Sequence, residues 1–481
     1  MGLGLGAGVG LAATVTRPHE SQHHLTASQP ALSPPAPHVR WDSFGFGLNA
    51  DTDAMWVQVW REGEGWLPGR LYQRSRLALD PAATVINYGQ ALFEGLKAYR
   101  RNLDGGKETL ALFRPELNAQ RMNEGCRRLL LPEIDEEGFV TACAATAMAN
   151  GRWVPPQGKG ALYLRPVLFG SGAKLGVGPS REVTLVIYAS PVNTYFKNPR
   201  PIGLLMQDRY YRATPGGVGG VKYAGNYAPT FAASRLARAG LREAGYDEIL
   251  YLDARKDTYV EEAGAANFFA VLRPERPKRG LLGFNLYSNH AKDAEPPSPE
   301  EEMMRARGSA IPVEGAEEFA GLEVCTPTTD RKTILDGVTR RSLLDIAKYV
   351  LGVKAEARDI TYEEVMEAEE AFCSGTGAVV TPVGRLRRMR TDADGNESLD
   401  PEVQLKHCTT PGPLTMKMRE ILMGIQEGRL PDVFDWVVDA KQVARAGGVA
   451  FPTSFCRATH RGYAYYGGYK SCWPRFSYRE L

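Results

Sequence analysis

The sequence lacks several features that would assign it quickly to a class of protein. It has no uninterrupted apolar run long enough to cross a bilayer, which takes about 20 residues. Its seven cysteines are odd in number and form no C-x-x-C pair, which argues against a disulfide framework and a zinc site and favours a reducing compartment. The net charge is only +2, so composition gives no argument for binding nucleic acid or an anionic membrane surface.

Acidic residues are also nearly absent from the first forty positions, where Glu20 stands alone among many small residues. This composition predicts an organelle transit peptide over residues 1–40, and we expect the plastid before the mitochondrion. The alternative is a plain disordered tail on a cytoplasmic protein. Gly6 stands where a myristoylation signal needs Ser or Thr, so that modification is not expected.

The remaining chain is long enough for two or three domains with apolar cores. Stretches of strand and helix pattern occur in both halves, which predicts an α/β or α+β protein. Strands are expected near 55–60, 161–165, 183–188, 247–252 and 267–272, and helices over 115–131 and 229–244. The expected divisions are a small domain over 41–190, a linker over 191–201, a large domain over 202–438 with a disordered insertion at 273–320, and an unassigned tail over 439–481.

One lysine has an unusual setting. Lys222 ends the glycine-rich run 216–222, and Tyr227 follows five residues later. Lysine amines form Schiff bases with carbonyls, including the aldehyde of pyridoxal phosphate, whereas the ordinary interpretation is a solvated lysine in a flexible loop. The loop is not a nucleotide phosphate loop, because no glycine directly precedes the lysine and no Ser or Thr follows it.

Other segments offer the groups that such a cofactor needs. Glu262 could meet the pyridine nitrogen, although a Glu-Glu pair is often only a solvated strand end. Arg121 could hold the phosphate bidentately, although helices carry many surface arginines. Thr376 and the segment Val338-Thr339 at an expected helix start offer hydroxyl and N–H groups to an anion.

Aromatic and basic residues could complete the site. Tyr227 could donate to the phenolate oxygen of the cofactor. The substrate side could be lined by Tyr88, Phe93, Tyr163 and Arg165, although tyrosines in strands are more often part of a core.

Together these segments resemble the branched-chain amino acid aminotransferases, which are fold-type-IV pyridoxal phosphate enzymes. The similar stretches occur in the order typical of that family, between about Trp41 and Val438. They are Tyr88-Gly89-Gln90-Ala91-Leu92-Phe93-Glu94-Gly95-Leu96-Lys97, Leu112-Phe113-Arg114-Pro115 with Arg121-Met122, Leu162-Tyr163-Leu164-Arg165-Pro166, the Lys222 and Glu262 loops, Arg331-Lys332-Thr333-Ile334-Leu335, Gly337-Val338-Thr339-Arg340 and Ser374-Gly375-Thr376.

The resemblance implies two domains with the cofactor at their interface, and a homodimer in which the partner completes the substrate pocket. It implies transfer of the amino group of leucine, isoleucine or valine to 2-oxoglutarate. The implied roles are Lys222 as Schiff-base lysine and proton carrier, Arg121, Thr376, Val338 and Thr339 at the phosphate, Glu262 and Tyr227 at the ring, Tyr88, Phe93, Tyr163 and Arg165 at the substrate, and backbone N–H groups near Ala265 and Gly377 at its carboxylate.

Two departures from the family leave other functions open. Asp336 stands where the family usually has proline, and its charge could weaken phosphate binding. The segment 273–320 replaces a short turn. The alternatives are a D-amino acid aminotransferase or lyase of the same fold, and a weakly catalytic relative that only binds the cofactor.

Overall fold

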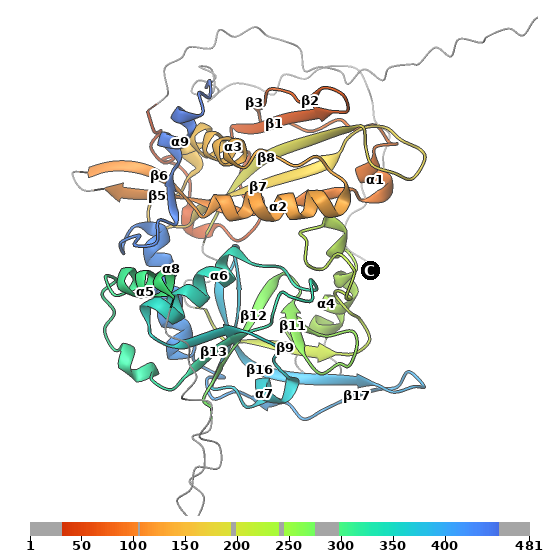
Figure 1. Cartoon of the computed structure of the whole chain (residues 1–481), viewed down its shortest axis with the longest axis vertical. Coiled ribbons are helices and arrows are strands. Elements are labelled where there is room, and N and C mark those ends of the chain that lie inside the picture. Colours follow the sequence, from red (N-terminus) through yellow and green to blue (C-terminus); the bar gives the residue numbers. More distant parts are fainter. Residues whose placement is uncertain (1–30, 104–105, 194–198, 240–244, 275–297, 452–481) are drawn as a thin grey trace, which may run out of the picture.

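The computed structural model describes residues 31–103, 106–193, 199–239, 245–274 and 298–451. Two β-sheets, one above the other in Figure 1, form the centres of two units of the chain. Helices pack on both sheets, so the predicted two-part α+β organisation is confirmed. None of the described helices is both long and apolar enough to span a membrane.

The first sheet is entirely antiparallel. Its nine strands are β1 (Ala54–Arg61), β2 (Gly65–Trp66), β3 (Arg70–Gln73), β4 (Ala91–Phe93), β5 (Leu96–Leu103), β6 (Lys107–Phe113), β7 (Ala161–Gly170), β8 (Glu182–Val192) and β19 (Val437–Asp439). The main path is β19-β6-β5-β7-β8-β1-β2, with β3 paired to β1 and β4 paired to β7. The short strand β4 matters most for the site, because it places Phe93 at the boundary with the second unit.

Four helices belong to this unit: α1 (Thr84–Tyr88), α2 (Pro115–Leu129), α3 (Glu136–Ala149) and α9 (Ala440–Ala446). The helix α2 begins at Pro115, as the sequence predicts, because a proline in the first turn removes no hydrogen bond. Asp135 caps α3 by accepting a hydrogen bond from the backbone N–H of Gly138 at 2.8 Å. Both helices bury apolar faces against the sheet.

The second sheet contains a closed ring of strands. Its ten strands are β9 (Ile202–Gln207), β10 (Glu248–Leu252), β11 (Val260–Ala263), β12 (Ala266–Leu272), β13 (Glu323–Thr326), β14 (Lys354–Ala357), β15 (Glu370–Gly375), β16 (Val379–Thr391), β17 (Glu397–Leu399) and β18 (Val403–Gln404). Along the path β11-β10-β9-β16-β15-β12, the last strand also pairs with the first. This closure makes a six-stranded barrel, which leaves no open edge among these strands.

Helices surround the barrel and fill the space between the units. They are α4 (Thr230–Ala239), α5 (Pro299–Gly308), α6 (Val338–Asp345), α7 (Tyr362–Met366), α8 (Pro413–Glu427) and the short helices η4 (Ala224–Asn226), η5 (Ala316–Phe319) and η6 (Ile346–Val350). Two other short helices, η1 (Trp41–Ser43) and η3 (Gly151–Trp153), lie with the first unit. One apolar cluster joins Tyr99 and Phe113 of the first sheet to Val338 of α6 and Leu414 of α8. The two units therefore share part of their core.

The structure moves two of the expected boundaries. Residues 31–40 are not a tail, because Ala36 donates its N–H to the carbonyl of Arg152 at 2.9 Å and Ser33 accepts a bond from buried Arg100 at 2.8 Å. The expected linker begins later than 191, since Pro191 and Val192 still belong to β8. Residues 1–30 and 194–198 lie outside the described part of the chain.

The predictions for the insertion and the tail are wrong in part. From residue 298 the segment forms α5 and η5, and Phe319 is buried in the shared core. The chain then returns to the first unit, where β19 pairs with β6 and α9 packs beside α3 (Figure 1). Residues 275–297 and 452–481 are outside the described residues.

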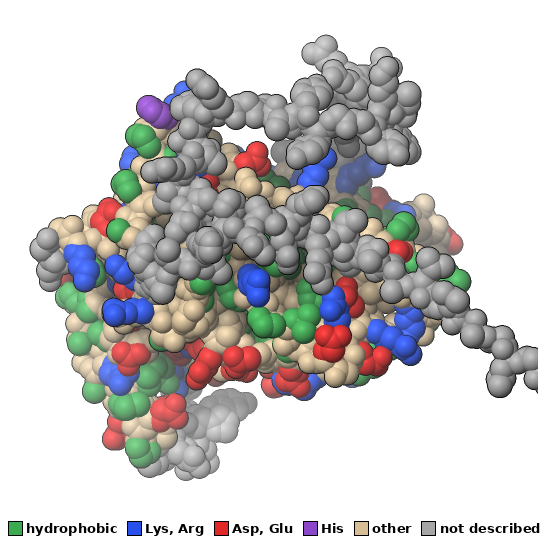
Figure 2. Space-filling model, turned by 90° about the horizontal axis from the view of Figure 1, so that it is seen from above, with side chains coloured by type: hydrophobic (Ala, Val, Ile, Leu, Met, Phe, Trp, Pro, Cys, Tyr) green, Lys and Arg blue, Asp and Glu red, His purple; other side chains and the backbone are tan. Residues whose placement is uncertain are grey.

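The described surface shows no dominance of either charge on the face drawn in Figure 2. Lysine and arginine side chains lie interspersed with aspartate and glutamate side chains and with apolar ones. This mixture agrees with the small net charge of the whole chain.

Candidate active site

Lys222 lies where the two units meet. Its ammonium nitrogen donates to the hydroxyl of Tyr227 at 3.1 Å and is 4.7 Å from the centre of the Phe93 ring. The backbone N–H of Phe93 donates to the carbonyl of Lys222 at 3.2 Å, which ties β4 of the first unit to the lysine loop of the second. The amine thus lies beside two aromatic rings that contact each other, with centres 5.0 Å apart, and is not a freely solvated group.

Glycine is required in the lysine loop because the backbone approaches a second loop closely. A Cβ added at Gly219 would lie 2.4 Å from the carbonyl oxygen of Thr333, and one at Gly220 would lie 2.8 Å from that of Lys332. The side chain of Asn226 secures the loop from within by donating to the carbonyls of Val218 at 2.8 Å and Val221 at 3.0 Å.

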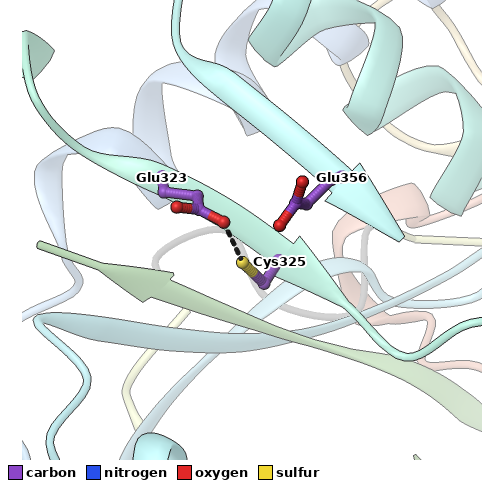
Figure 3. Close-up of side chains that lie close together, drawn as sticks. All are labelled: Glu323, Cys325 and Glu356. Atoms are coloured by element: carbon purple, nitrogen blue, oxygen red, sulfur yellow. Dashed lines mark hydrogen bonds between the residues drawn. The ribbon is translucent and has the colours of Figure 1, made fainter. Parts of the chain in front are cut away.

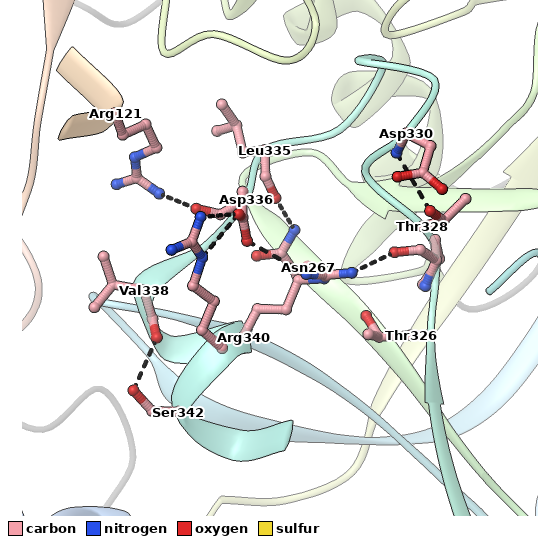
Figure 4. Close-up of polar contacts among 12 residues, drawn as sticks. Arg121, Asn267, Thr326, Thr328, Asp330, Leu335, Asp336, Val338, Arg340 and Ser342 are labelled. Carbon is pink, nitrogen blue, oxygen red and sulfur yellow. Dashed lines mark hydrogen bonds and ion pairs between the residues drawn. The ribbon is translucent and has the colours of Figure 1, made fainter. Parts of the chain in front are cut away.

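Arg121 reaches the site from α2, but a carboxylate holds it. Its Nε and Nη2 donate to the two oxygens of Glu94 at 2.8 and 2.7 Å. Its Nη1 donates to the carbonyl of Asp336 at 3.0 Å, just before α6 (Figure 4). Burial opposes ionisation of Glu94, but Arg121 and the amide of Asn118 nevertheless hold the pKa of that carboxyl below its ordinary value.

Three of the four residues expected at the phosphate line one cavity, and Arg121 is not among its lining residues. Val338 and Thr339 form the first turn of α6, and Thr376 follows β15. Asn118, three residues before Arg121 on α2, lines the same cavity. The N–H groups of a helix start and nearby hydroxyls are a suitable environment for a phosphate.

Glu262 is buried in β11, and both of its carboxylate oxygens interact with other residues of the chain. Its Oε1 is 2.7 Å from Arg212 and accepts the N–H of Leu335 at 3.2 Å, and its Oε2 accepts from Asn267 at 3.1 Å. Burial raises the pKa of Glu262, while Arg212 opposes that rise and favours the carboxylate. The Lys222 charge also acts on this carboxyl, so the two groups share one electrostatic environment.

The expected substrate side is an aromatic and basic wall. The guanidinium of Arg165 lies 4.9 Å from the centre of the Phe93 ring and 5.2 Å from that of Tyr163. Its Nη2 donates to the Tyr163 hydroxyl at 3.3 Å. Phe46 closes this wall edge-on to Tyr163, with ring centres 5.0 Å apart.

Two turns that were expected to offer N–H groups to a carboxylate lie side by side. Ala265 joins β11 to β12, and Gly377 joins β15 to β16, whose neighbouring strands pair Asn267 with Ser374. The carbonyl of Gly377 accepts a hydrogen bond from the buried side chain of Lys97 at 3.0 Å. Burial, with a smaller contribution from Arg419, lowers the pKa of Lys97 to about 7.

Tyr88 is placed differently from the other substrate-side residues. Its side chain is 38% exposed, and its hydroxyl donates to the carbonyl of Leu175. Within this single chain, the structure therefore brings together the other expected residues but leaves Tyr88 at the surface. Their individual roles stay predictions.

Several residues of the site had no role assigned from the sequence. They are Glu94, Lys97, Asn118, Arg212 and Phe46. The sequence does mark Glu94, because it is the one carboxylate in the apolar run 91–96. A carboxylate buried with such a run needs a positively charged or hydrogen-bonding partner. No comparable signal marks Arg212, which is one arginine among many.

A separate cluster has the composition of a metal site. Ligand atoms of Glu323, Cys325 and Glu356 lie within 4.8 Å of one another (Figure 3). However, Lys354 contacts both carboxylates, at 3.3 and 3.4 Å, and Arg358 contacts them at 3.6 and 3.0 Å. Burial and the hydrogen bond to Glu323 raise the pKa of the Cys325 thiol to about 12, so the cluster is best interpreted as an ion-pair network.

Comparisons with known proteins agree with this geometry. The family model described as amino-transferase class IV matches residues 91–386. The chain is 38% identical over 400 residues to the chloroplastic branched-chain-amino-acid aminotransferase 2 of Arabidopsis thaliana, covering 83% of this chain and 85% of that protein. It is 36% identical over 401 residues to the mitochondrial enzyme 1 of the same plant, covering 83% and 86%.

A solved structure shows the same fold. The branched-chain amino acid aminotransferase of Thermobaculum terrenum, in its PLP-bound holo form, superposes with a TM-score of 0.54 at 20% identity. The match covers 81% of this chain and 99% of that one.

Proposed function

The chain belongs to the class IV aminotransferases, and from this membership we propose that it is a pyridoxal phosphate-dependent branched-chain amino acid aminotransferase. It exchanges the amino group of leucine, isoleucine or valine with 2-oxoglutarate. The observation that carries this proposal is the position of Lys222, whose amine lies beside Phe93 and Tyr227 at the boundary of the two units.

The residues present fit pyridoxal phosphate. The chain offers the Lys222 amine, a cavity lined by a helix start and hydroxyls, and the buried carboxylate of Glu262, which is paired with Arg212 and acted on by the charge of Lys222. We propose that Arg121, Val338, Thr339 and Thr376 hold the phosphate and that Tyr227 and Glu262 meet the ring. When bound, the cofactor supplies an electron sink for the charge that develops on the substrate Cα.

The protein itself supplies proton transfer and orientation. We propose that the Lys222 amine removes the proton from the substrate Cα and returns it in the reverse reaction. The hydroxyl of Tyr227, 3.1 Å away, orients this amine. Burial favours the protonated form of Glu262, and Arg212 opposes this by favouring the carboxylate.

The substrate is recognised by the wall of Phe93, Tyr163 and Arg165 and by the two turns at Ala265 and Gly377. Aromatic rings around Arg165 suit a branched side chain in one half-reaction, and the guanidinium suits the second carboxylate of glutamate in the other. One methylene changes transition-state binding by only about 1–3 kcal/mol, so discrimination among the three branched substrates is modest.

We also propose a homodimer and an organellar location. Tyr88 is hydrogen-bonded to Leu175. Leu175 and Val177 are 90% and 87% exposed, and such apolar side chains favour contact with a second copy. Residues 31–40 pack on the folded unit, so the proposed targeting segment lies within 1–30. The two Arabidopsis relatives are chloroplastic and mitochondrial, and we favour the plastid. Fusing residues 1–30 to a fluorescent protein tests this location.

The function is tested by assaying leucine with 2-oxoglutarate and recording the absorbance spectrum with and without leucine. Borohydride reduction followed by digestion should place the pyridoxyl label on the Lys222 peptide, and Lys222→Ala should lose the label. Lys332→Ala, at an exposed lysine packed against the same loop, should keep it. A label elsewhere, turnover of D-alanine instead of leucine, or bound cofactor without turnover would each overturn the proposal.

A further inference from the structure

A second pocket lies outside the residues assigned to transamination. It has a volume of about 380 Å³, within the range of small-molecule sites, and is lined by Pro215, Asp253, Ala254, Arg255, Lys256, Tyr259, Glu261 and Arg331. The lining comes from the lysine loop, the β10–β11 connection and the loop before α6.

Glu261 lines this pocket with a carboxyl group that interacts with the Thr333 side chain but leaves one oxygen without a hydrogen-bond partner in the described part of the chain. The residue is only 4% exposed, and its Oε2 has no hydrogen-bond partner among the described residues. Burial and the neighbouring charge of Glu262 raise the pKa of Glu261 to about 7, although a hydrogen bond with the Thr333 side chain and the charge of Arg212 oppose the rise. A buried polar atom without a partner is costly, so a donor from a ligand would be favourable here.

Two cations on the same pocket also have no carboxylate partner. Neither Arg255 nor Lys256 forms an ion pair within the described part of the chain. Asp253, which is nearest to them in sequence, is already occupied by the backbone N–H groups of Lys256, Thr258 and Tyr259 at 3.0, 2.9 and 2.7 Å. Asp253 therefore shapes the loop and leaves the two cations available to an anion.

The remaining wall is rigid and partly apolar. Arg331 lies over the Tyr259 ring, with its guanidinium carbon 4.6 Å from the ring centre, and pairs with Asp359. Pro215 contributes an apolar ring from the opposite loop. Besides the groups that are already paired, the pocket thus combines one unpartnered hydrogen-bond acceptor, two cations that form no ion pair among the described residues, and some apolar surface.

We propose that this pocket binds a free α-amino acid as a zwitterion, separately from the catalytic site. The ammonium group meets Oε2 of Glu261, and the carboxylate meets Arg255 and Lys256. A purely anionic ligand would leave Glu261 unpaired, and a purely cationic one would leave the two basic residues unpaired, so the zwitterion suits all three groups.

Occupancy of this pocket acts on the loops that form the catalytic site. Pro215 belongs to the loop that carries Lys222, and Arg331 to the loop that leads to Asp336 and α6. These loops contact each other through Gly219 and Thr333, and Arg212 donates to the Thr333 carbonyl at 3.1 Å. A ligand that bridges them stabilises their arrangement, and by thermodynamic reciprocity a bound cofactor strengthens its binding.

The test uses calorimetric titration of borohydride-reduced holoenzyme, whose Lys222 can no longer react. L-leucine is the probe, a choice that rests on the proposed function. We expect saturable binding that is at least about tenfold weaker in Glu261→Gln and in the double variant Arg255→Ala/Lys256→Ala. Glu302→Gln and Lys107→Ala, at exposed positions elsewhere, should bind like the parent protein. 4-Methylpentanoate and 3-methylbutylamine, which each lack one charged group of leucine, should bind at least about tenfold more weakly than leucine.

Several outcomes would overturn the proposal. They are no saturable binding, binding that survives both pocket variants, and equal binding of the two singly charged analogues. Circular dichroism confirms that the variants are folded. If leucine turns over but the reduced enzyme binds none, the pocket proposal alone fails. If the protein neither turns over leucine nor takes up pyridoxal phosphate, the proposed function fails. Leucine is then titrated into the untreated protein, so that the pocket is still tested.

Discussion

The carboxylate of Glu94 and the guanidinium of Arg121 form a bidentate ion pair, with N–O distances of 2.8 and 2.7 Å, at the boundary between the two units. Glu94 is completely buried, and Asn118 donates to it at 2.8 Å. The proposed phosphate ligand Arg121 is therefore held in one orientation by Glu94. This arrangement reduces the loss of side-chain freedom when an anion binds.

Glu94→Gln should destabilise the protein, because it leaves the buried charge of Arg121 without a carboxylate. Breaking a buried pair in this way costs about 3–5 kcal/mol, measured as the free energy of unfolding in urea. Glu124→Gln is the control, because Glu124 is exposed on α2, the helix that carries Arg121, and this change should alter the stability little. Added inorganic phosphate should stabilise the variant more than the parent protein. Equal unfolding curves for Glu94→Gln and Glu124→Gln would show that the pair contributes nothing.

Glu262→Gln should lower kcat/KM about 100-fold more than Glu261→Gln, a difference of about 2.7 kcal/mol in transition-state free energy. Only Glu262 is paired with Arg212 and shares its environment with Lys222. Steady-state kinetics with leucine and 2-oxoglutarate measure the difference. Similar losses in the two variants would mean that the wrong carboxylate was assigned to the ring nitrogen.

Lys97 should make stability depend on pH above neutrality. Burial lowers its pKa to about 7 in the folded protein, whereas the unfolded chain has the ordinary lysine value of about 10.4. Between these values the unfolded state binds the extra proton, so the free energy of unfolding contributed by Lys97 rises with pH. Below about pH 7 both states are protonated, and the cost of burying the charge is fully present.

The comparison of Lys97→Met with the parent protein isolates this effect, because other groups titrate in both proteins. Unfolding in urea at pH 7 and at pH 9.5 should show a smaller increase for the variant. Lys107→Met, at an exposed lysine, should follow the parent curve. Parallel curves for all three proteins would show that Lys97 titrates normally.

Asp336→Asn should change the affinity for pyridoxal phosphate by less than about tenfold, or 1.4 kcal/mol. The sequence alone suggests that this carboxylate repels a phosphate, but the structure pairs it with Arg340 at 3.3 Å and with Arg341 at 2.8 Å. Despite burial, these partners hold the pKa of Asp336 below its ordinary value. Cofactor titration by absorbance measures the affinity. A much tighter complex in the variant would show that Asp336 does repel the cofactor phosphate.

Local patterns in the sequence predicted the elements whose formation depends on near neighbours. The alternation at 55–60 forms β1, and Pro115 begins α2. The glycines of the Lys222 loop indicated close backbone contact, which Gly219 and Gly220 make. These features follow from φ/ψ preferences and from side-chain periodicity, which act within a few residues.

Local patterns failed for segments whose stability comes from distant contacts. The segment 437–446 is too short to show a period, and it becomes β19 and α9 because β6 and α3 offer surfaces to it. The helix α5 has a highly polar sequence, which led to the expectation of disorder, although Phe319 shortly after it is buried in the core.

By itself, the sequence determined which residue types are available to the site and, through their order, the family to which the chain belongs. The tertiary structure alone decided that Glu94 holds Arg121, that Arg212 pairs with Glu262 and that Glu261 faces a different pocket from its neighbour. The physical reason is that the ionisation and position of a buried charge depend on which opposite charge the closed barrel and the packed units bring within about 3 Å of it. Residues 50 positions apart, such as Arg212 and Glu262, carry no local signal of that meeting.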